Sequence, residues 1–390
     1  MTVTKRGFPD EEFRARVAAA QEQMAAAELD ALLLTEEADV AYVTGFQTRF
    51  WESPTRPWFI VMPGSGAPIA VIPSIGADLM ARTWLTDIRT WRAPDYEDDG
   101  VSLLAETLAE SVGRTGRVGV PMALESHLRM PLADWARLED HLPNIRFVPD
   151  AGVLRRLRMV KSAGEIAKIE TACAIAGRAF DRVPEIAAAG VPLDLVFRRF
   201  QMLCLEEGAD WVRYLAGGAG PGGYADVISP ASAHPLEPGD VLMLDTGLTH
   251  DGYFCDFDRN FSVGPPSAET RSAHARLIEA VQAGAEIARP GVLASDLFHA
   301  MDRIVTGGAG GSEAGRLGHG LGLQLTEGLS LIPQDDTVLV EGMVLTLEPG
   351  VTLGNGRIMV HEEDIVVTDG APRFLSDPFG PEIAVLEGRA

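Results

Sequence analysis

The sequence predicts an α+β protein with two domains: an N-terminal α/β domain over residues 1–150 and a C-terminal domain over residues 151–390. Three observations support this prediction. Helix-like and strand-like segments alternate as far as Pro149, a long amphipathic segment then follows, and the rest of the chain repeats itself. With 390 residues, the chain is long enough for two or three domains.

Hydrophobic spacing predicts the elements of the N-terminal domain. Apolar residues recur at helical spacing between residues 11 and 28. Continuous apolar runs at 30–35, 58–62 and 68–73 predict buried strands. One long amphipathic helix is expected over 153–181, at the start of the C-terminal domain.

The C-terminal domain contains two copies of a helix, helix, hairpin unit. Helical segments at 187–200 and 288–301 each precede an apolar strand. The two strands are GDVLMLDTG (239–247) and GMVLTLEPG (342–350), which share the pattern G-x-V-L-x-L-acid-x-G. This repeat predicts two similar halves related by a pseudo-two-fold axis.

Each copy contributes two carboxylates. Asp245 and Glu348 occupy equivalent positions at the end of the shared strand pattern. A second strand then carries another acid in each copy, Asp256 in the first and Glu362 in the second. If equivalent hairpins face one another across the axis, the four acids converge on one central site.

Buried acids among Val, Leu, Met and Ile require a compensating positive charge. A pair of divalent cations provides it, and paired ions lower the pKa of a water that can act as a nucleophile. His319, in the glycine-rich segment GRLGHGLGLQLTEG (315–328), is the candidate nitrogen ligand. One imidazole with four carboxylates favours Mn²⁺, with Fe²⁺, Co²⁺ and Zn²⁺ as alternatives.

Charge limits the classes of partner. The chain has 33 Lys and Arg residues against 56 Asp and Glu residues, a formal net charge of −23. This argues against nucleic-acid or anionic-membrane partners, because phosphate binding requires a positive surface. A neutral or cationic small molecule fits better.

Cysteine usage and hydropathy indicate the compartment. The three cysteines are widely separated and form no CxxC pair, so neither a disulfide framework nor a thiolate zinc site is expected. The N-terminus carries charged residues where a secretory signal needs an apolar core. No segment approaches the roughly 18 uninterrupted apolar residues of a membrane span. We expect a cytoplasmic protein.

The motifs resemble those of metallopeptidase family M24, the "pita-bread" fold of methionine aminopeptidase, aminopeptidase P, prolidase and creatinase. GDVLMLDTG, DGYFCDFDRNF, GHGLGL, LEPG and EEDIVVT stand in the family order. Residues 29–46 resemble the creatinase-type N-terminal domain, and 158–176 resemble the start of the catalytic domain. The resemblance implies a pita-bread catalytic domain, Xaa-Pro peptidase-like hydrolysis of an amide bond in a dipeptide or small molecule, and a homodimer. The metal ligands that it implies are Asp245, Asp256, His319, Glu348 and Glu362.

The resemblance also implies roles around these ligands. Glu348 would take a proton from the attacking water, which requires a carboxylate within hydrogen-bond reach. Arg259 matches an arginine that pairs with a carboxylate in support of the ligands. Asp258 stands where the family usually has threonine and, two residues after Asp256, is expected on the same side of the strand, where it could tune or augment the metal site.

Several substrate residues of the family are replaced. Thr326 stands in the place of a histidine that helps to hold the substrate carbonyl, and Val360 in that of an arginine, next to His361. Thr326 and His361 are therefore the candidates for catalytic roles at these positions. A second histidine is absent from the rebuilt segment 215–240, in which Tyr224 and His234 are the candidate substitutes for substrate binding.

Residues of the N-terminal domain form a further candidate substrate site. Arg49 and Trp51 lie in an expected loop, and in dimeric relatives this domain reaches the partner's active site. Three functions stay open at this point: a peptidase, a non-peptidase hydrolase or lyase that acts on a small zwitterion, and a binding protein on a degenerate scaffold. Retention of all five ligands argues against the binding protein.

Overall fold

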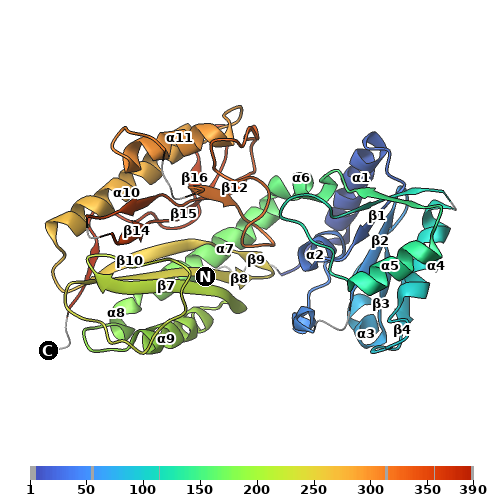
Figure 1. The fold of residues 1–390 in the computed structure, drawn as a ribbon, viewed down its shortest axis with the longest axis horizontal. Coiled ribbons are helices and arrows are strands. Elements are labelled where there is room, and N and C mark those ends of the chain that lie inside the picture. Colours follow the sequence, from blue (N-terminus) through green and yellow to red (C-terminus); the bar gives the residue numbers. More distant parts are fainter. Residues whose placement is uncertain (1–5, 54–56, 114, 312–314, 355, 388–390) are drawn as a thin grey trace. The chain divides into compact units, whose positions relative to one another are not determined.

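The computed structural model describes residues 6–53, 57–113, 115–311, 315–354 and 356–387. It divides into two compact units, one over Arg6–Arg158 and the other from Met159 onward. Figure 1 labels their elements along the chain. The division follows Arg158, slightly beyond the expected position near 150.

The first unit is built on a six-stranded mixed sheet in the order β4-β3-β2-β1-β5-β6. Pairs β1–β2 and β2–β3 are antiparallel, whereas β3–β4, β1–β5 and β5–β6 are parallel. Its strands are β1 (Ala31–Leu34), β2 (Phe59–Pro63), β3 (Ile69–Pro73), β4 (Ile88–Trp91), β5 (Arg117–Val120) and β6 (Arg146–Pro149). The expected strands at 30–35, 58–62 and 68–73 thus agree closely with β1, β2 and β3.

Helices of the first unit pack against this sheet through their apolar faces. One side of the sheet packs against α4 and α5 in a cluster that includes the fully buried Leu104, Leu108 and Leu138. The helices are α1 (Asp10–Ala26), α2 (Glu37–Thr44), α3 (Ala77–Met80), α4 (Val101–Val112), α5 (Leu132–His141) and α6 (Val153–Met159), with 3-10 helices η1 (Arg49–Glu52) and η2 (Ser74–Gly76).

The prediction of a single helix over 153–181 is wrong, because α6 ends at Met159 and α7 (Ala163–Asp181) begins separately. Val160 forms a β-bridge with Met343, which takes the chain out of helical conformation. Ser162 then caps the new helix: its hydroxyl accepts the Glu165 N–H, and the Glu165 carboxylate accepts the Ser162 N–H. Such a reciprocal pair satisfies two backbone donors at a helix start.

The second unit has two halves of similar order, as the repeat predicts. In the first half, α7, α8 (Val183–Ile186) and α9 (Leu193–Glu206) precede β7 (Trp211–Pro221), β8 (Asp240–His250), β9 (Tyr253–Phe254) and β10 (Phe257–Val263). In the second, α10 (Ala268–Ile287) and α11 (Ala294–Val305) precede β11 (Gly318–Gly320), β12 (Val344–Leu347), β13 (Gly350–Thr352), β14 (Ile358–Val360), β15 (Glu363–Val366) and β16 (Arg373–Phe374). Helices lie on opposite sides of these strands, α8 and α9 on one side and α10 and α11 on the other (Figure 1).

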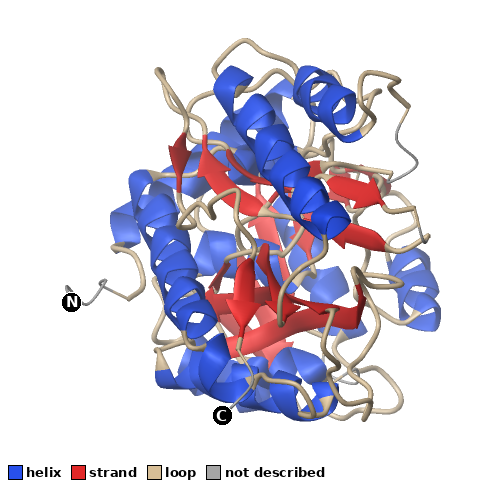
Figure 2. Cartoon of the chain, turned by 90° about the vertical axis from the view of Figure 1, so that its left-hand side faces the viewer, coloured by secondary structure: helices blue, strands red, loops and turns tan. Residues whose placement is uncertain are grey.

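Three sheets organise the strands of this unit, which lie between helices (Figure 2). The first half forms a sheet in the order β17-β10-β8-β7, whose edge is β17 (Ala384–Leu386) from the C-terminal end of the described chain. The second half forms the sheet β11-β12-β15-β16, and β13 pairs with β14. The hairpins β8–β10 and β12–β15 are both antiparallel and correspond to the predicted repeat.

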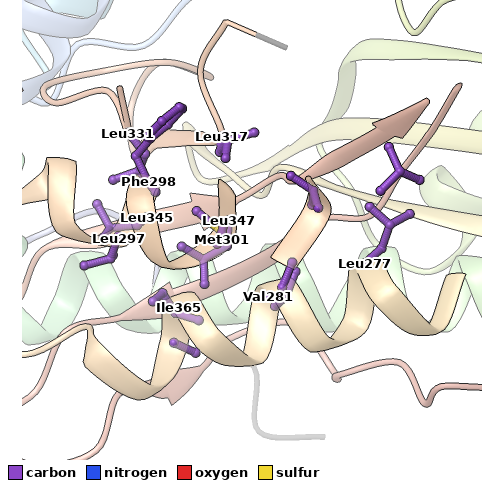
Figure 3. Packing of buried hydrophobic residues seen from close by; sticks show 14 of the residues in the cluster. Leu277, Val281, Leu297, Phe298, Met301, Leu317, Leu331, Leu345, Leu347 and Ile365 are labelled. Carbon is purple, nitrogen blue, oxygen red and sulfur yellow. The ribbon is translucent and has the colours of Figure 1, made fainter. Parts of the chain in front are cut away.

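A large apolar cluster fixes the second half. It joins one face of α10 and α11 to β12 and β15, and full burial of one such side chain stabilises the fold by about 1.5–3 kcal/mol. Figure 3 labels members of this cluster: Leu277, Val281, Leu297, Phe298, Met301, Leu317, Leu331, Leu345, Leu347 and Ile365. Among the described helices, none combines the length and apolar character needed to cross a membrane.

Candidate metal centre

The four predicted acids lie at matching places in the two hairpins. Asp245 is in β8, whereas Glu348 directly follows β12. Asp256 directly precedes β10, and Glu362 directly precedes β15. His319 is the middle residue of β11, which pairs with β12 on the side opposite β15. Long-range strand pairing therefore brings all five predicted ligands to one place.

Two groups of donor atoms result, and Asp256 belongs to both. One ligand atom from each of Asp245, Asp256 and Glu362 lies within 4.8 Å of the others. Nε2 of His319 lies 3.3 Å from Oδ2 of Asp256 and 3.6 Å from Oε1 of Glu348. All five side chains are buried or nearly so, and Glu348 is the most exposed at 17%.

Burial and mutual repulsion disfavour the charged forms of these acids. Burial raises the pKa of Asp245 well above its usual value, and the charges of Asp256 and Glu348 raise it further. The pKa of Glu362 is likewise raised by burial and by Asp245. For Asp256, burial and Glu348 raise the pKa, whereas Arg316 opposes this change. A protein does not hold such a cluster in charged form without compensation.

The donor set fits divalent cations. Among the described residues, Oδ1 of Asp245 is buried and has no hydrogen-bond partner, as expected for an oxygen that serves as a ligand. Carboxylate oxygens with one imidazole suit Mn²⁺, Fe²⁺, Co²⁺ or Zn²⁺. The His319 ring is held by Nδ1, which lies 2.9 Å from the Gly320 carbonyl oxygen and leaves Nε2 directed at the acids.

Asp258 and Arg259 lie directly behind the ligands. Asp258 accepts the Glu362 N–H at 2.7 Å and Nδ2 of Asn260 at 3.0 Å, so both of its carboxylate oxygens are occupied by protein donors. Arg259 pairs with Glu363 at 3.0 Å and also donates to the Glu362 carbonyl at 3.1 Å. Arg259 thus pairs with a carboxylate, whereas a role of Asp258 in tuning or augmenting the metal site stays a prediction.

Thr326 lies at the more exposed side of the centre, where it meets a residue that the sequence analysis missed. Nη2 of Arg316 donates to the Thr326 hydroxyl at 3.2 Å, and Nε of Arg316 lies 3.1 Å from Oε1 of Glu348. The Arg316 side chain is 37% exposed. The sequence did hold a signal for Arg316. It lies three residues before His319 in the glycine-rich segment, so its charged side chain falls close to the predicted ligand.

A buried ion pair holds the segment that carries Thr326. Nζ of Lys161 lies 2.9 Å from Oε1 of Glu327, and these side chains are only 1% and 5% exposed. Tyr214, on β7, was not among the predicted site residues; it interacts with the Asp245 side chain and favours its charged form. Burial and then the Asp245 charge raise the pKa of Tyr214.

Three other predicted residues have clear surroundings. His361 is buried, with Nε2 3.1 Å from Glu363 and Nδ1 3.5 Å from Asp258, in the layer behind the ligands. Tyr224 is also buried: its hydroxyl accepts the Val360 N–H at 2.6 Å. The His234 side chain is 70% exposed and lies 3.9 Å from Glu237 in the same loop. The structure does not bring His234 together with the four acids predicted as metal ligands.

The candidate residues of the first unit also have defined places. Arg49 is exposed in η1. Trp51 is 8% exposed and packs inside its own unit, with its ring 6.0 Å from that of Trp58 and the Arg129 guanidinium 5.1 Å above it. Trp51 therefore contributes to the packing of its unit.

Fold and donor set together define a metal-dependent hydrolase with an additional N-terminal domain. Residues 167–369 match the family model of metallopeptidase family M24, and residues 16–160 match the family model of the creatinase/prolidase N-terminal domain. The chain belongs to metallopeptidase family M24. The pita-bread fold class and the family membership that the motifs implied are thereby confirmed.

Individual relatives agree with this assignment. The chain is 32% identical over 373 residues to a probable dipeptidase PepE of Mycobacterium bovis, covering 94% of this chain and 95% of that protein. It is 26% identical over 350 residues to a Xaa-Pro dipeptidase of Pyrococcus horikoshii, covering 89% of this chain and 92% of the relative. Among solved structures, dipeptidase PepE of Mycobacterium ulcerans has a TM-score of 0.84 at 28% identity, covering 97% and 99% of the two chains.

Proposed function

We propose that this protein hydrolyses an amide or peptide C–N bond in a small substrate, with Xaa-Pro dipeptides as the first candidates. Two divalent ions, Mn²⁺ by preference, would be held by Asp245, Asp256, His319, Glu348 and Glu362. The observation that carries the proposal is the pair of overlapping donor groups that share Asp256. The names of the relatives, dipeptidase and Xaa-Pro dipeptidase, support the choice of substrate.

When bound, the ions would supply Lewis acidity and lower the pKa of a water to near neutrality. Glu348 is the ligand best placed to accept the proton of this water, because it is the most exposed of the four acids. Arg316 contacts both Glu348 and Thr326, and Arg316 and Thr326 can donate hydrogen bonds to a substrate carbonyl or carboxylate. Tyr214, on the neighbouring strand β7, would hold the Asp245 side chain in place.

A second candidate is a non-peptidase hydrolase or lyase of the same family that acts on a small zwitterion. It is supported by the loss of the expected imidazoles: Thr326 replaces one, and the candidates for the other are the buried Tyr224 and the exposed His234. A threonine hydroxyl cannot shuttle a proton near neutral pH as an imidazole can. The homodimer and the cytoplasmic location remain predictions.

A substrate screen tests the proposal. Protein reconstituted separately with Mn²⁺, Fe²⁺, Co²⁺ and Zn²⁺ would be incubated with Xaa-Pro dipeptides, with non-proline dipeptides and with betaine-like compounds. We expect two ions per chain and metal-dependent release of free proline. Asp256→Ala and Glu348→Ala should abolish turnover.

The outcomes separate the candidates. Turnover of betaine-like compounds without peptide cleavage would favour the second candidate. Unchanged activity in Asp256→Ala or Glu348→Ala would refute the assignment of the site, and failure to bind any divalent ion would refute a metal-dependent function altogether.

A further inference from the structure

The two hairpins that carry the ligands hold one another through their backbones. Asp258, two residues after the ligand Asp256, accepts the backbone N–H of the other half's ligand, Glu362, at 2.7 Å. Asp364, two residues after Glu362, accepts the backbone N–H of Asp256 at 2.9 Å. The contacts are reciprocal between the two halves, and both accepting side chains are fully buried.

From this arrangement we propose that Asp258 and Asp364 are positioning residues, each of which orients the metal ligand of the opposite half. The inference rests on the proposed function, because it concerns the two ions of the same centre. Each carboxyl oxygen satisfies a backbone N–H that would otherwise lie unpaired away from water. The hydrogen bond fixes the peptide plane at the ligand residue, and so the direction in which that residue's side chain leaves the backbone.

Further contacts hold Glu362 in place around Asp258. Asn260 donates one hydrogen bond to Asp258 at 3.0 Å and another to the Val360 carbonyl at 2.6 Å. The Tyr224 hydroxyl accepts the Val360 N–H at 2.6 Å. Both backbone groups of Val360, two residues before Glu362, are therefore held by side chains, which gives the buried Tyr224 a structural role beside the centre.

The side-chain contacts of Asp364 fall on one of its two carboxyl oxygens. Its Oδ2 accepts Sγ–H of Cys173 at 3.2 Å as well as the Asp256 N–H. Its own N–H donates to the Ser376 hydroxyl at 3.0 Å. Among the described residues, Oδ1 of Asp364 has no hydrogen-bond partner. The Asp256 N–H is thus held by a single carboxyl oxygen.

Both positioning residues should act on the two-ion centre. Glu362 and Asp256 belong to the acidic trio with Asp245, and Asp256 also lies next to His319 in the second group. Loss of Asp258 or of Asp364 should therefore weaken metal binding. Removal of the partners of metal ligands typically costs 10–100-fold in metal affinity.

Binding of Mn²⁺ and Co²⁺ tests this role, measured by titration calorimetry and by metal analysis after dialysis. We expect Asp258→Ala and Asp364→Ala each to weaken metal binding by roughly 10-fold or more. The Co²⁺ absorption spectrum should change in both variants.

Matched variants control for general damage. Asp240 is a buried aspartate of the same sheet that accepts a backbone N–H, from Glu237 at 2.9 Å, without contacting the ligands. Asp240→Ala should leave both affinities unchanged. Asp258→Asn and Asp364→Asn keep the shape of the side chain and an accepting oxygen, so their losses should be smaller, and they carry the test if an alanine variant does not fold.

Each outcome has a definite meaning. If the wild type binds two ions and either alanine variant keeps the wild-type affinity for both, the inference is wrong while the proposed function stands. If the wild type binds no divalent ion, the proposed function fails and the inference fails with it.

Discussion

Replacement of Asp245 by asparagine should change stability in opposite directions with and without metal. The substitution keeps the size of the side chain, and an amide can still face Tyr214 and Glu362, which both interact with Asp245. In the metal-free protein it removes a charge that burial and the neighbours Asp256 and Glu348 all disfavour. We therefore expect the metal-free variant to be more stable than the metal-free wild type, and the metal-saturated variant to be less stable.

The structure sets the size of both effects. Ligand atoms of the acidic trio lie within 4.8 Å of one another. Two unit charges at that distance repel by roughly 3.5 kcal/mol at an effective dielectric constant of about 20. Partial protonation relieves some of this repulsion, so the metal-free variant should gain about 1–2 kcal/mol. With metal at about 1,000 times its dissociation constant, one ion stabilises the wild type by about 4 kcal/mol, and the variant should lose most of that contribution.

Differential scanning calorimetry in chelator and in saturating Mn²⁺ measures both effects. Asp240→Asn serves as the control, because that buried aspartate does not contact the ligands, and it should show no such inversion. A metal-free Asp245→Asn protein that is less stable than the wild type would contradict the electrostatic reasoning. A variant that keeps the full stabilisation by Mn²⁺ would remove Asp245 from the ligand set.

Three further predictions follow from contacts around the centre. Lys161→Met should lower the free energy of unfolding in urea by about 3–5 kcal/mol, because it leaves the buried Glu327 carboxylate without its ion-pair partner. The double variant Lys161→Met, Glu327→Leu should recover most of this loss. Strictly additive losses would show that the pair does not interact. Arg316→Gln should retain both ions but lower kcat/KM by roughly 10–100-fold through loss of a charged donor beside Thr326, and loss of metal would show that Arg316 acts through Glu348. Burial, and then the neighbouring His361, lower the pKa of His274 from 6.5 to about 4; since the folded pKa lies below the unfolded one, this contribution is complete above pH 6.5 and is lost as the pH falls toward 4. The metal-free wild type should therefore lose roughly 2–3 kcal/mol more than His274→Gln between pH 7.5 and 4.5, and equal losses would show that His274 does not titrate in this way.

Much of the fold follows from local sequence patterns. Strands β1, β2 and β3 come from continuous apolar runs, and the repeated strand pattern predicts that β8 and β12 are equivalent. The break between α6 and α7 was also readable, since Ser162 and Glu165 have the spacing of a capping box. Helical periodicity on both sides of the break concealed it. The short strands β13, β14 and β16 carry too few residues for a periodic signal, and their pairing depends on distant parts of the chain.

The candidate site was only partly predictable, for physical reasons. Repetition identified the four acids without knowledge of their distances. Strand alternation placed Asp258 on the side of Asp256, but it could not show that the Asp258 oxygens are occupied by the Glu362 N–H and by Asn260. The contact between Arg316 and Thr326 depends on how the glycine-rich segment folds back along β11. Such contacts between distant residues leave no periodic signal in the sequence.

The place of β17 has a consequence for how the protein is made. Residues Ala384–Leu386 pair in parallel with Phe261–Val263 of β10, the strand that begins directly after Asp256. During synthesis, β10 therefore emerges from the ribosome more than a hundred residues before its outer neighbour exists. Until that neighbour arrives, the outer backbone edge of β10 is available for pairing with other chains, which is a known route to aggregation. Docking of Ala384–Leu386 should end the interval in which β10 is open to such pairing.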